Sequence, residues 1–321
     1  MKLTARNAKY FSIILVGVAL AFIINSFQGA ISPLFLSMVL GIVAGNFMNW
    51  SAGKTAATFA SRKCLRLGVV FLGFQISIDK FIEVGFRGLI AVIIIVTGVF
   101  LAIRLASKRF GLSDSLSTYI AGGFAICGAT AIAAISSVRK GEDRDLSYAV
   151  ALVALCGTLS VFVIPPLATL FGMSDASAGA WIGAAVHDVG QVIATASLIS
   201  PVALESAVIV KLTRVVLLIP LILLLARGSA STTSMRKATP TFVFAFVALA
   251  LLVNALSLPD SLIELGKESS KVLLSIGLFG MGLAVKWSQI KALGARPLAL
   301  GLGAWVAAGA FTLGVIEAVG L

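Results

Sequence analysis

Three polar side chains lie close together in an apolar stretch at residues 178–198. His187 is the only histidine of the chain, Asp188 follows it, and Gln191 lies one helical turn further on. On a helix, His187 and Gln191 would be i,i+4 neighbours and Asp188 and Gln191 i,i+3 neighbours. An ionisable group inside a membrane costs about 3 kcal/mol or more and usually marks a transport pathway. We predict that His187 and Asp188 couple transport to an ion and that Gln191 binds substrate. The alternative is a structural core histidine.

Two cations lie within the next apolar stretch. Lys211 and Arg214 are i,i+3 neighbours about ten residues from its start, too deep to reach the membrane surface easily. Arginine offers a planar fork that suits an oxoanion. We therefore predict that both residues bind an anionic substrate, with a structural ion pair to Asp188 or Glu205 as the alternative.

A glycine-rich run occupies the centre of residues 115–138. It reads GGFAICGATA from Gly122 to Ala131. Glycine costs a helix about 1 kcal/mol relative to alanine, so a helix break here is inexpensive. The half-helix that follows a break would present free amides to an anion. The predicted substrate-binding residues of this run are Gly122, Gly123, Cys127, Gly128 and Thr130. Close helix packing through small residues is the alternative.

Motifs for other chemistry are missing from the sequence. It contains no H-E-x-x-H zinc motif, no P-loop, no dinucleotide-binding glycine pattern and no Cys/His cluster with metal-ligand spacing. Cys64, Cys127 and Cys156 all lie in or beside apolar runs, which indicates packed thiols rather than disulfides. We expect no enzyme activity, no cofactor and no metal, although an intramembrane enzyme using Cys127 or His187 stays open.

The composition shows what kind of element must position these residues. Of 321 residues, 59% are hydrophobic and 12% charged, and the mean hydropathy is +1.08. No soluble domain has this composition. The net charge of +12 comes mostly from short loops between apolar runs, so it does not indicate nucleic-acid binding. We predict a single transmembrane domain, 1–321, of α-helices only.

Apolar runs of sufficient length recur along the whole chain. A helix needs roughly 20 mostly apolar residues to cross a bilayer, and on this rule we predict about eleven transmembrane helices, with the count least certain around 171–200. The predicted spans are 10–27, 32–47, 64–78, 86–106, 115–138, 146–171, 178–198, 202–226, 242–256, 272–285 and 297–319. Residues 10–138 would hold the first repeat, with a broken helix at 115–138. Residues 178–226 would hold a second broken, polar helix and a basic helix. The broken helices would cross near the midplane.

The distribution of basic residues predicts the orientation. Positive loops stay in the cytoplasm, which places the amino terminus inside and the carboxyl terminus outside. The residues behind this prediction are Lys54, Arg62, Lys63, Arg66, Arg104, Lys108, Arg109, Arg227, Arg236 and Lys237. One loop conflicts with it, because Arg139, Lys140 and Arg144 would then lie outside.

The chain contains an internal repeat. At a constant offset of 209 residues, Gly68 matches Gly277, Gly73 matches Gly282, Gly85 matches Gly294 and Arg87 matches Arg296. Segment 272–319 thus repeats segment 63–110, and the predicted crossings place the two copies in opposite directions. Inverted repeats are typical of transporters, with the substrate site near the midplane. Chance similarity between glycine-containing helices is the alternative.

Several motifs resemble the bacterial YeiH family, described as sulfate exporters. They are Leu72-Gly73-Phe74, Ile126 to Ile132, the segment VHDVGQV from Val186 to Val192, Val210 to Arg214, and Gly294 to Leu298. The resemblance covers nearly the whole chain. It implies an inner-membrane protein that moves sulfur oxyanions such as sulfite or sulfate outward.

A more distant resemblance is to the bile acid and sodium symporter fold, which is built from inverted repeats with two crossed broken helices. It rests on 72–89 and on the glycine-rich run. In that fold the second broken helix runs opposite to the first, whereas the predicted crossings make them parallel, so the crossing count near Gly172 conflicts with it. The sodium-binding pattern of that fold is not recognisable here.

These observations favour a secondary active transporter of a small anion in the bacterial inner membrane. The coupling ion is open between H⁺ and Na⁺, and a homo-oligomer is open as well. A sodium-coupled importer of an organic anion is the second hypothesis. An intramembrane enzyme and a purely structural membrane protein are the others.

Overall fold

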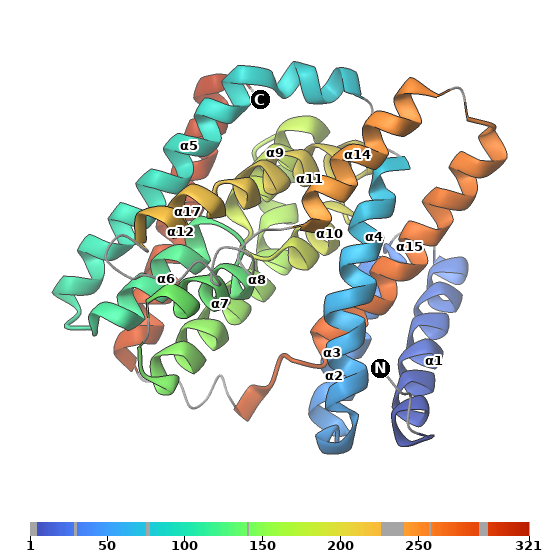
Figure 1. Cartoon of the computed structure of the whole chain (residues 1–321), viewed down its shortest axis with the longest axis horizontal. Helices are drawn as coiled ribbons and strands as arrows, with labels where there is room; N and C mark the ends of the chain where they lie inside the picture. The colour runs from blue at the N-terminus through green and yellow to red at the C-terminus, as the bar shows by residue number, and fades with distance from the viewer. Residues whose placement is uncertain are drawn as a thin grey trace. The chain divides into compact units, whose positions relative to one another are not determined.

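The computed structural model describes residues 5–28, 31–74, 78–139, 141–225, 241–256, 258–288 and 295–320. These residues form helices and connecting turns, with no β-strand among them (Figure 1). They group into two compact units. Unit 1 contains residues 1–81 and 241–287, and unit 2 contains residues 82–240 and 288–321.

Unit 1 is built around two long helical segments that pack side by side. Its elements are α1 (Ala5–Gln28), α2 (Pro33–Phe47), α3 (Lys54–Phe59), a π-helical turn (Ala60–Cys64), α4 (Leu65–Phe71), a 3-10 turn (Leu72–Phe74), α14 (Thr241–Ala255) and α15 (Asp260–Gly282). Segments 54–74 and 260–282 run antiparallel, because Gly280 lies against Ala60 and Gly266 against Phe74.

Glycines allow the close contacts in unit 1. Gly68 of α4 lies against Leu274, and Gly277 of α15 lies against Leu65. A side chain at any of these glycines would collide with the partner helix. Gly282 packs against the backbone of α2 near Met38, and Gly73 packs against the backbone of α14 near Phe246 and Ala250.

Unit 2 carries the polar and glycine-rich segments singled out in the sequence. Its elements are most of α5 (Ile78–Arg109), then α6 (Asp114–Ala125), α7 (Ala129–Val138), α8 (Asp143–Leu170), α9 (Asp175–Ala185), α10 (Val189–Ala196), α11 (Pro201–Val216), α12 (Leu218–Leu225) and α17 (Ala295–Val319). At 28 residues, α8 is about 42 Å long, whereas the 12 residues of α6 span only about 18 Å.

The segment 115–138 is a helical hairpin instead of the predicted single crossing. Gly123 of α6 packs against Ile132 of α7, and the Tyr119 hydroxyl donates a hydrogen bond to the Arg139 carbonyl oxygen at 2.8 Å. The two arms are therefore antiparallel and their ends meet. The physical reason is the turn at Gly128, whose φ of 66° is easily adopted only by glycine.

The segment 178–198 is a second hairpin in place of a predicted crossing. Residues of both arms share one buried cluster, with Ala178 and Ile182 from α9 and Val192 and Ala196 from α10. The start of α11 lies beside the start of α9, since the Ser206 hydroxyl donates to the Ala176 carbonyl oxygen at 2.9 Å. Because only four residues separate α10 from α11, α10 must return to the level at which α9 began.

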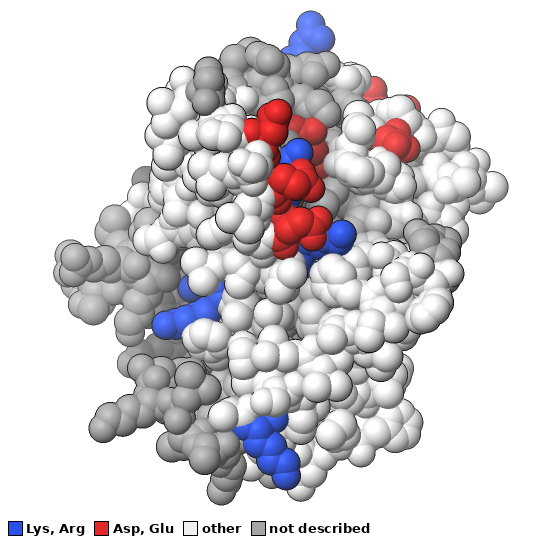
Figure 2. Space-filling model, turned by 90° about the vertical axis from the view of Figure 1, so that its right-hand side faces the viewer, with Lys and Arg blue, Asp and Glu red and all other residues white. Residues whose placement is uncertain are grey.

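The membrane character is clear, although the predicted eleven spans are not all seen. Among the described residues, five helices are long and apolar enough to cross a membrane: Ala8–Phe27, Arg87–Arg109, Arg144–Leu170, Pro201–Leu225 and Ala295–Val319. Pro33–Phe47 and Thr241–Ala255 are shorter apolar helices. Most atoms drawn in colour or white in Figure 2 are uncharged, and most of the acidic side chains gather in one patch beside a few basic ones. Gly294, of the predicted repeat pair Gly85 and Gly294, lies outside the described residues.

Candidate functional site

The tips of the two hairpins meet at one buried ammonium group. Lys211 on α11 is fully buried and donates hydrogen bonds to the Ile126 carbonyl oxygen at 2.8 Å and to the Val186 carbonyl oxygen at 2.6 Å. Ile126 belongs to the break between α6 and α7, and Val186 to the break between α9 and α10. The predicted helix breaks thus lie next to each other in unit 2.

Arg214 holds the same two helix ends one turn further along α11. Its guanidinium donates to the carbonyl oxygens of Phe124 and Ala125 at 2.8 and 2.6 Å, and to those of Gly183 and Ala184 in α9. A helix carries partial negative charge on its last carbonyl groups, and here that charge is out of reach of water. Lys211 and Arg214 therefore neutralise the carboxyl-terminal ends of both α6 and α9.

Small residues bring α11 close enough for these contacts. Gly179 packs against Ala203 and Gly183 packs against Ala207, and any side chain at either glycine would collide with the α11 backbone. This spacing of small residues every four positions lets membrane helices approach closely. The predicted position of Lys211 and Arg214 on one helix face is correct, while their binding of an anionic substrate stays a prediction.

The amide ends of α7 and α10 differ in how they are capped. The N-cap residue of α7 is Gly128, which has no side chain to accept a hydrogen bond. The N-cap residue of α10 is Asp188, whose carboxylate accepts a hydrogen bond from the Gly190 amide at 3.0 Å. A β-carbon on Gly128 would lie 3.5 Å from the second carboxylate oxygen of Asp188, so the two amide ends are neighbours. Asp188 is half-buried.

His187 and Gln191, which were predicted to be neighbours on one helix face, contact different helices. His187 is fully buried and its ring lies 4.1 Å from that of Phe124, centroid to centroid. Within the described residues, neither ring nitrogen makes a well-formed hydrogen bond, although the ring interacts with the Phe124 backbone. Gln191 donates to the Ala154 carbonyl oxygen at 3.1 Å and to the Thr158 hydroxyl at 3.3 Å, which ties α10 to α8. Because the chain breaks at 186–188, the predicted continuous polar face does not form.

The remaining predicted site residues fall into two groups. Gly122 and Gly123 lie inside α6, where they allow close packing against Ile135 and Ile132 of α7. For these two glycines the packing alternative is therefore correct, whereas Gly128 lies at the helix break. Cys127 is buried in the turn itself, and Thr130 is exposed on the first turn of α7. The three cysteines are free thiols, and no group of metal-ligating residues occurs within the described ranges.

An ionic network at the base of the first hairpin was missed by the sequence reasoning. Asp114 forms ion pairs with Arg104 at 2.6 Å and with Arg139 at 2.7 Å. The hydrogen bond from Arg104 is the main reason why the pKa of Asp114 lies below its usual value. Nearby, the buried carboxylate of Asp145 accepts hydrogen bonds from the hydroxyls of Ser113 and Ser115. The interleaving of acidic and basic residues around Arg139 is the sequence signal for this network.

Fold and site together define a helical membrane protein with two hairpins whose tips are joined by buried cations. Comparison with known proteins identifies its family. The family described as "Conserved hypothetical protein 698" matches residues 10–301, and the chain belongs to this family of UPF0324, or YeiH, membrane proteins.

The relatives cover most of the chain. A UPF0324 membrane protein of Corynebacterium glutamicum is 35% identical, over 90% of this chain and 86% of the relative. One from Pseudomonas putida is 35% identical, over 90% and 87%. The UPF0324 inner membrane protein YeiH of Escherichia coli K12 is 34% identical, over 87% and 84%. No solved structure matches the chain.

Proposed function

We propose that this protein is a secondary active transporter of a small oxyanion, with its site at the tips of the two hairpins. The observation that carries the proposal is the joining of both tips by Lys211 and Arg214. Helix breaks inside a membrane expose backbone groups, and they are tolerated where they line a binding site or cavity. Each arm is about half as long as a full crossing, which would bring the tips to the middle of the bilayer.

The amide end of α7 is the proposed anion site. The carbonyl ends of α6 and α9 already have their cations, and the N-cap residue of α7, Gly128, has no side chain to accept a hydrogen bond, so we place the anion at the amide end after Gly128. Thr130 is exposed on the same turn and adds a hydroxyl. Sulfate and sulfite are the first candidates, as the resemblance implies. Lys211 and Arg214 would act by fixing both tips and by their positive charge.

Asp188 is the proposed coupling group. An anion on the α7 amides would lie close to the Asp188 carboxylate, and two negative charges placed close together repel each other. Binding of the anion would therefore require Asp188 to take up a proton. His187 remains the second predicted member of the coupling pair. The same arrangement leaves Na⁺ open as the coupling ion.

Contacts in unit 1 support the inverted repeat. At the offset of 209 residues, Leu65 corresponds to Leu274 and Gly68 to Gly277. Gly68 contacts Leu274, and Gly277 contacts Leu65, which is the reciprocal pairing expected across a two-fold axis. At the same offset, α2 at residues 33–47 corresponds to residues 242–256, which is α14 shifted by one residue. Gly282 packs against α2 and its equivalent Gly73 packs against α14.

The hairpins also suggest an orientation without the earlier conflict. Each hairpin returns to the side from which it started, so Arg139 lies on the same side as Arg104, and both pair with Asp114. Replacing two crossings by hairpins keeps the amino terminus in the cytoplasm and the carboxyl terminus outside. Arg139, Lys140 and Arg144 then follow the positive-inside rule. An inside-negative potential would drive anion export without ATP, at about 2.3 kcal/mol per charge per 100 mV.

Flux measurements in proteoliposomes test the proposal. Radiolabelled sulfate and sulfite are supplied with pH and sodium gradients imposed separately, and Asp188→Asn is the key variant. Asparagine keeps the cap on α10 but cannot carry the charge. We expect flux that responds to the pH gradient in the wild type and loses that response in the variant. Flux driven only by sodium would transfer coupling to Na⁺. No flux of either anion from folded protein would contradict the oxyanion assignment.

A further inference from the structure

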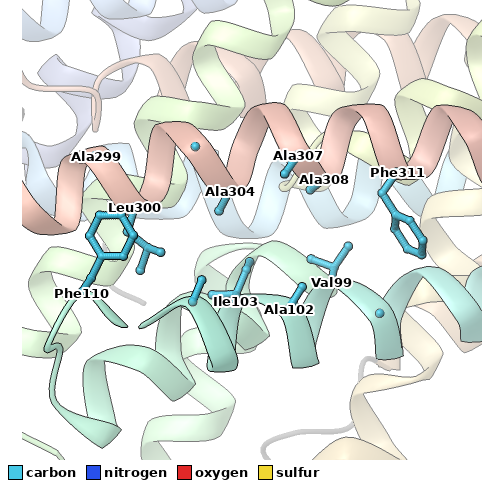
Figure 3. Close-up of a pocket in the computed structure, with 13 residues that line it drawn as sticks. Val99, Ala102, Ile103, Phe110, Ala299, Leu300, Ala304, Ala307, Ala308 and Phe311 are labelled. Atoms are coloured by element: carbon cyan, nitrogen blue, oxygen red, sulfur yellow. The ribbon is translucent and has the colours of Figure 1, made fainter. Parts of the chain in front are cut away.

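An apolar groove runs between α5 and α17 in unit 2, apart from the hairpin tips. It has a volume of about 400 Å³, and its ends are marked by Phe110 near Ala299 and by Phe311 near Val99 (Figure 3). Small residues from both helices line its length, including Gly98, Ala102, Gly303 and Ala307. Both helices are long and apolar enough to cross a membrane.

The length of the groove indicates what fits into it. The stretch from Gly98 to Phe110 is about 18 Å long at 1.5 Å per residue, close to half of a hydrocarbon core about 30 Å thick. An acyl chain of a phospholipid extends through one leaflet, which is this half-thickness. The groove therefore matches one acyl chain in length.

Cations gather at one end of the groove. Lys108 and Arg109 precede Phe110 at the end of α5, and Arg296 lies one turn before Leu300 at the start of α17. All three cationic side chains are exposed. A hydrocarbon chain gains little by leaving the bilayer for an equally apolar groove, so the headgroup must decide which lipid stays. Cations at a membrane surface favour anionic headgroups by about 1 kcal/mol each, a factor of about five.

We propose that this groove binds one acyl chain of an anionic phospholipid, whose headgroup contacts Lys108, Arg109 and Arg296. Native mass spectrometry of the full chain with phosphatidylglycerol or phosphatidylcholine tests this directly. The wild type should retain phosphatidylglycerol at least tenfold better. Replacing the three cations by glutamine should lower retention about fivefold per cation, whereas Lys54→Gln, Arg62→Gln and Lys63→Gln in unit 1 should have no effect. Equal retention of both lipids by the wild type would overturn the proposal.

Filling the groove tests the position of the chain. Gly303 and Gly314 both lie on α17 with open space where a side chain would start, but only Gly303 lines the groove. With a phosphatidylglycerol that carries a photoreactive acyl chain, cross-links to α5 and α17 should disappear in Gly303→Leu and persist in Gly314→Leu. Loss in both variants, or loss in neither, would contradict this site. A photoreactive amino acid at Gly303 that cross-links mainly to a second copy of the chain would assign the groove to a dimer instead.

Discussion

The two hairpins of unit 2 share several features and differ in the residue that caps the second arm. Each first arm begins with a serine cap followed by aspartate, Ser113-Asp114 in α6 and Ser174-Asp175 in α9. Ile126 and Val186, 60 residues apart, both accept a hydrogen bond from Lys211. At the same offset, Gly128 caps α7 and Asp188 caps α10.

In the proposed function, this difference separates the ends that support the hairpins from the end that binds the ligand. The carbonyl ends of both hairpins are alike, since Lys211 and Arg214 donate hydrogen bonds to both. The amide ends differ, because the N-cap of α10 is an aspartate that accepts a hydrogen bond from the Gly190 amide, whereas the N-cap of α7 is a glycine. We place the ligand at the amide end behind this glycine, beside the half-buried Asp188.

Removal of Arg214 should have the largest effect, because this one side chain donates hydrogen bonds to both hairpins. Arg214→Ala leaves the buried carbonyl groups of Phe124, Ala125, Gly183 and Ala184 without their cation, which should cost about 3–5 kcal/mol and abolish transport. Thermal unfolding in detergent and flux from equal amounts of protein measure the two effects. Arg214→Lys keeps the charge and should recover part of the stability. Full stability and flux in Arg214→Ala would show that the hairpin tips do not depend on this residue.

Separating α11 from α9 should have the second largest effect, because the close packing of these helices positions Lys211 and Arg214. Gly183→Leu would drive a side chain into the Ala207 backbone and move Lys211 and Arg214 away from both tips. We expect a loss of about 1–3 kcal/mol or more and little flux. Gly314→Leu is the matched control, since that glycine faces open space on α17. Equal behaviour of the two variants would mean that the contact between α9 and α11 does not position the cations.

The sequence was sufficient to predict membrane helices and a broken helix in the glycine-rich run, but it treated His187 to Gln191 as one continuous helix face, so the break at 186–188 was not located. His187, Asp188, Gly128, Lys211 and Arg214 all lie within or beside the two tips. The direction of the chain after each break was not predictable, because an apolar segment of 20 residues satisfies the span rule whether it crosses or returns. The hydrogen-bond partners of Lys211 and Arg214 could not be predicted either. These partners are backbone carbonyl groups, which every residue carries, so the residue types do not point to them. Acidic side chains and substrate were therefore the partners considered.

Gly128 distinguishes the first hairpin from the second, and its replacement should have a moderate effect. In Gly128→Ala, the φ of 66° and ψ of −133° would strain any residue with a β-carbon, at about 1–3 kcal/mol. We expect lower thermal stability together with weaker anion flux, because the first amides of α7 would shift. Gly111→Ala is the control, as it has a φ of 64° in open space. It should lose stability and keep the flux per folded molecule. If Gly128→Ala also keeps that flux, the anion site does not lie at this amide end.

Substitutions at the bases of the hairpins should have the smallest effect on stability, and this effect should depend on pH. Arg104 and Arg139 hold Asp114 at the base of the first hairpin, whereas Asp175 occupies the corresponding position in the second. The Arg104 hydrogen bond lowers the pKa of Asp114 in the folded state. The ionised carboxylate therefore stabilises the folded state at any pH above the unfolded pKa of about 4. This contribution is lost as the pH falls through the lower folded pKa. Because Asp114 is more than half exposed, the contribution should stay below about 1 kcal/mol. Thermal unfolding of Asp114→Asn and Asp175→Asn between about pH 7 and pH 3 measures it. Asp114→Asn should destabilise the protein at neutral pH and make less difference at the acid end, whereas Asp175→Asn, which removes none of the ion pairs seen among the described residues, should have a smaller effect at neutral pH. A pH-independent difference between Asp114→Asn and the wild type would attribute the effect to packing at the base and not to the ion pairs.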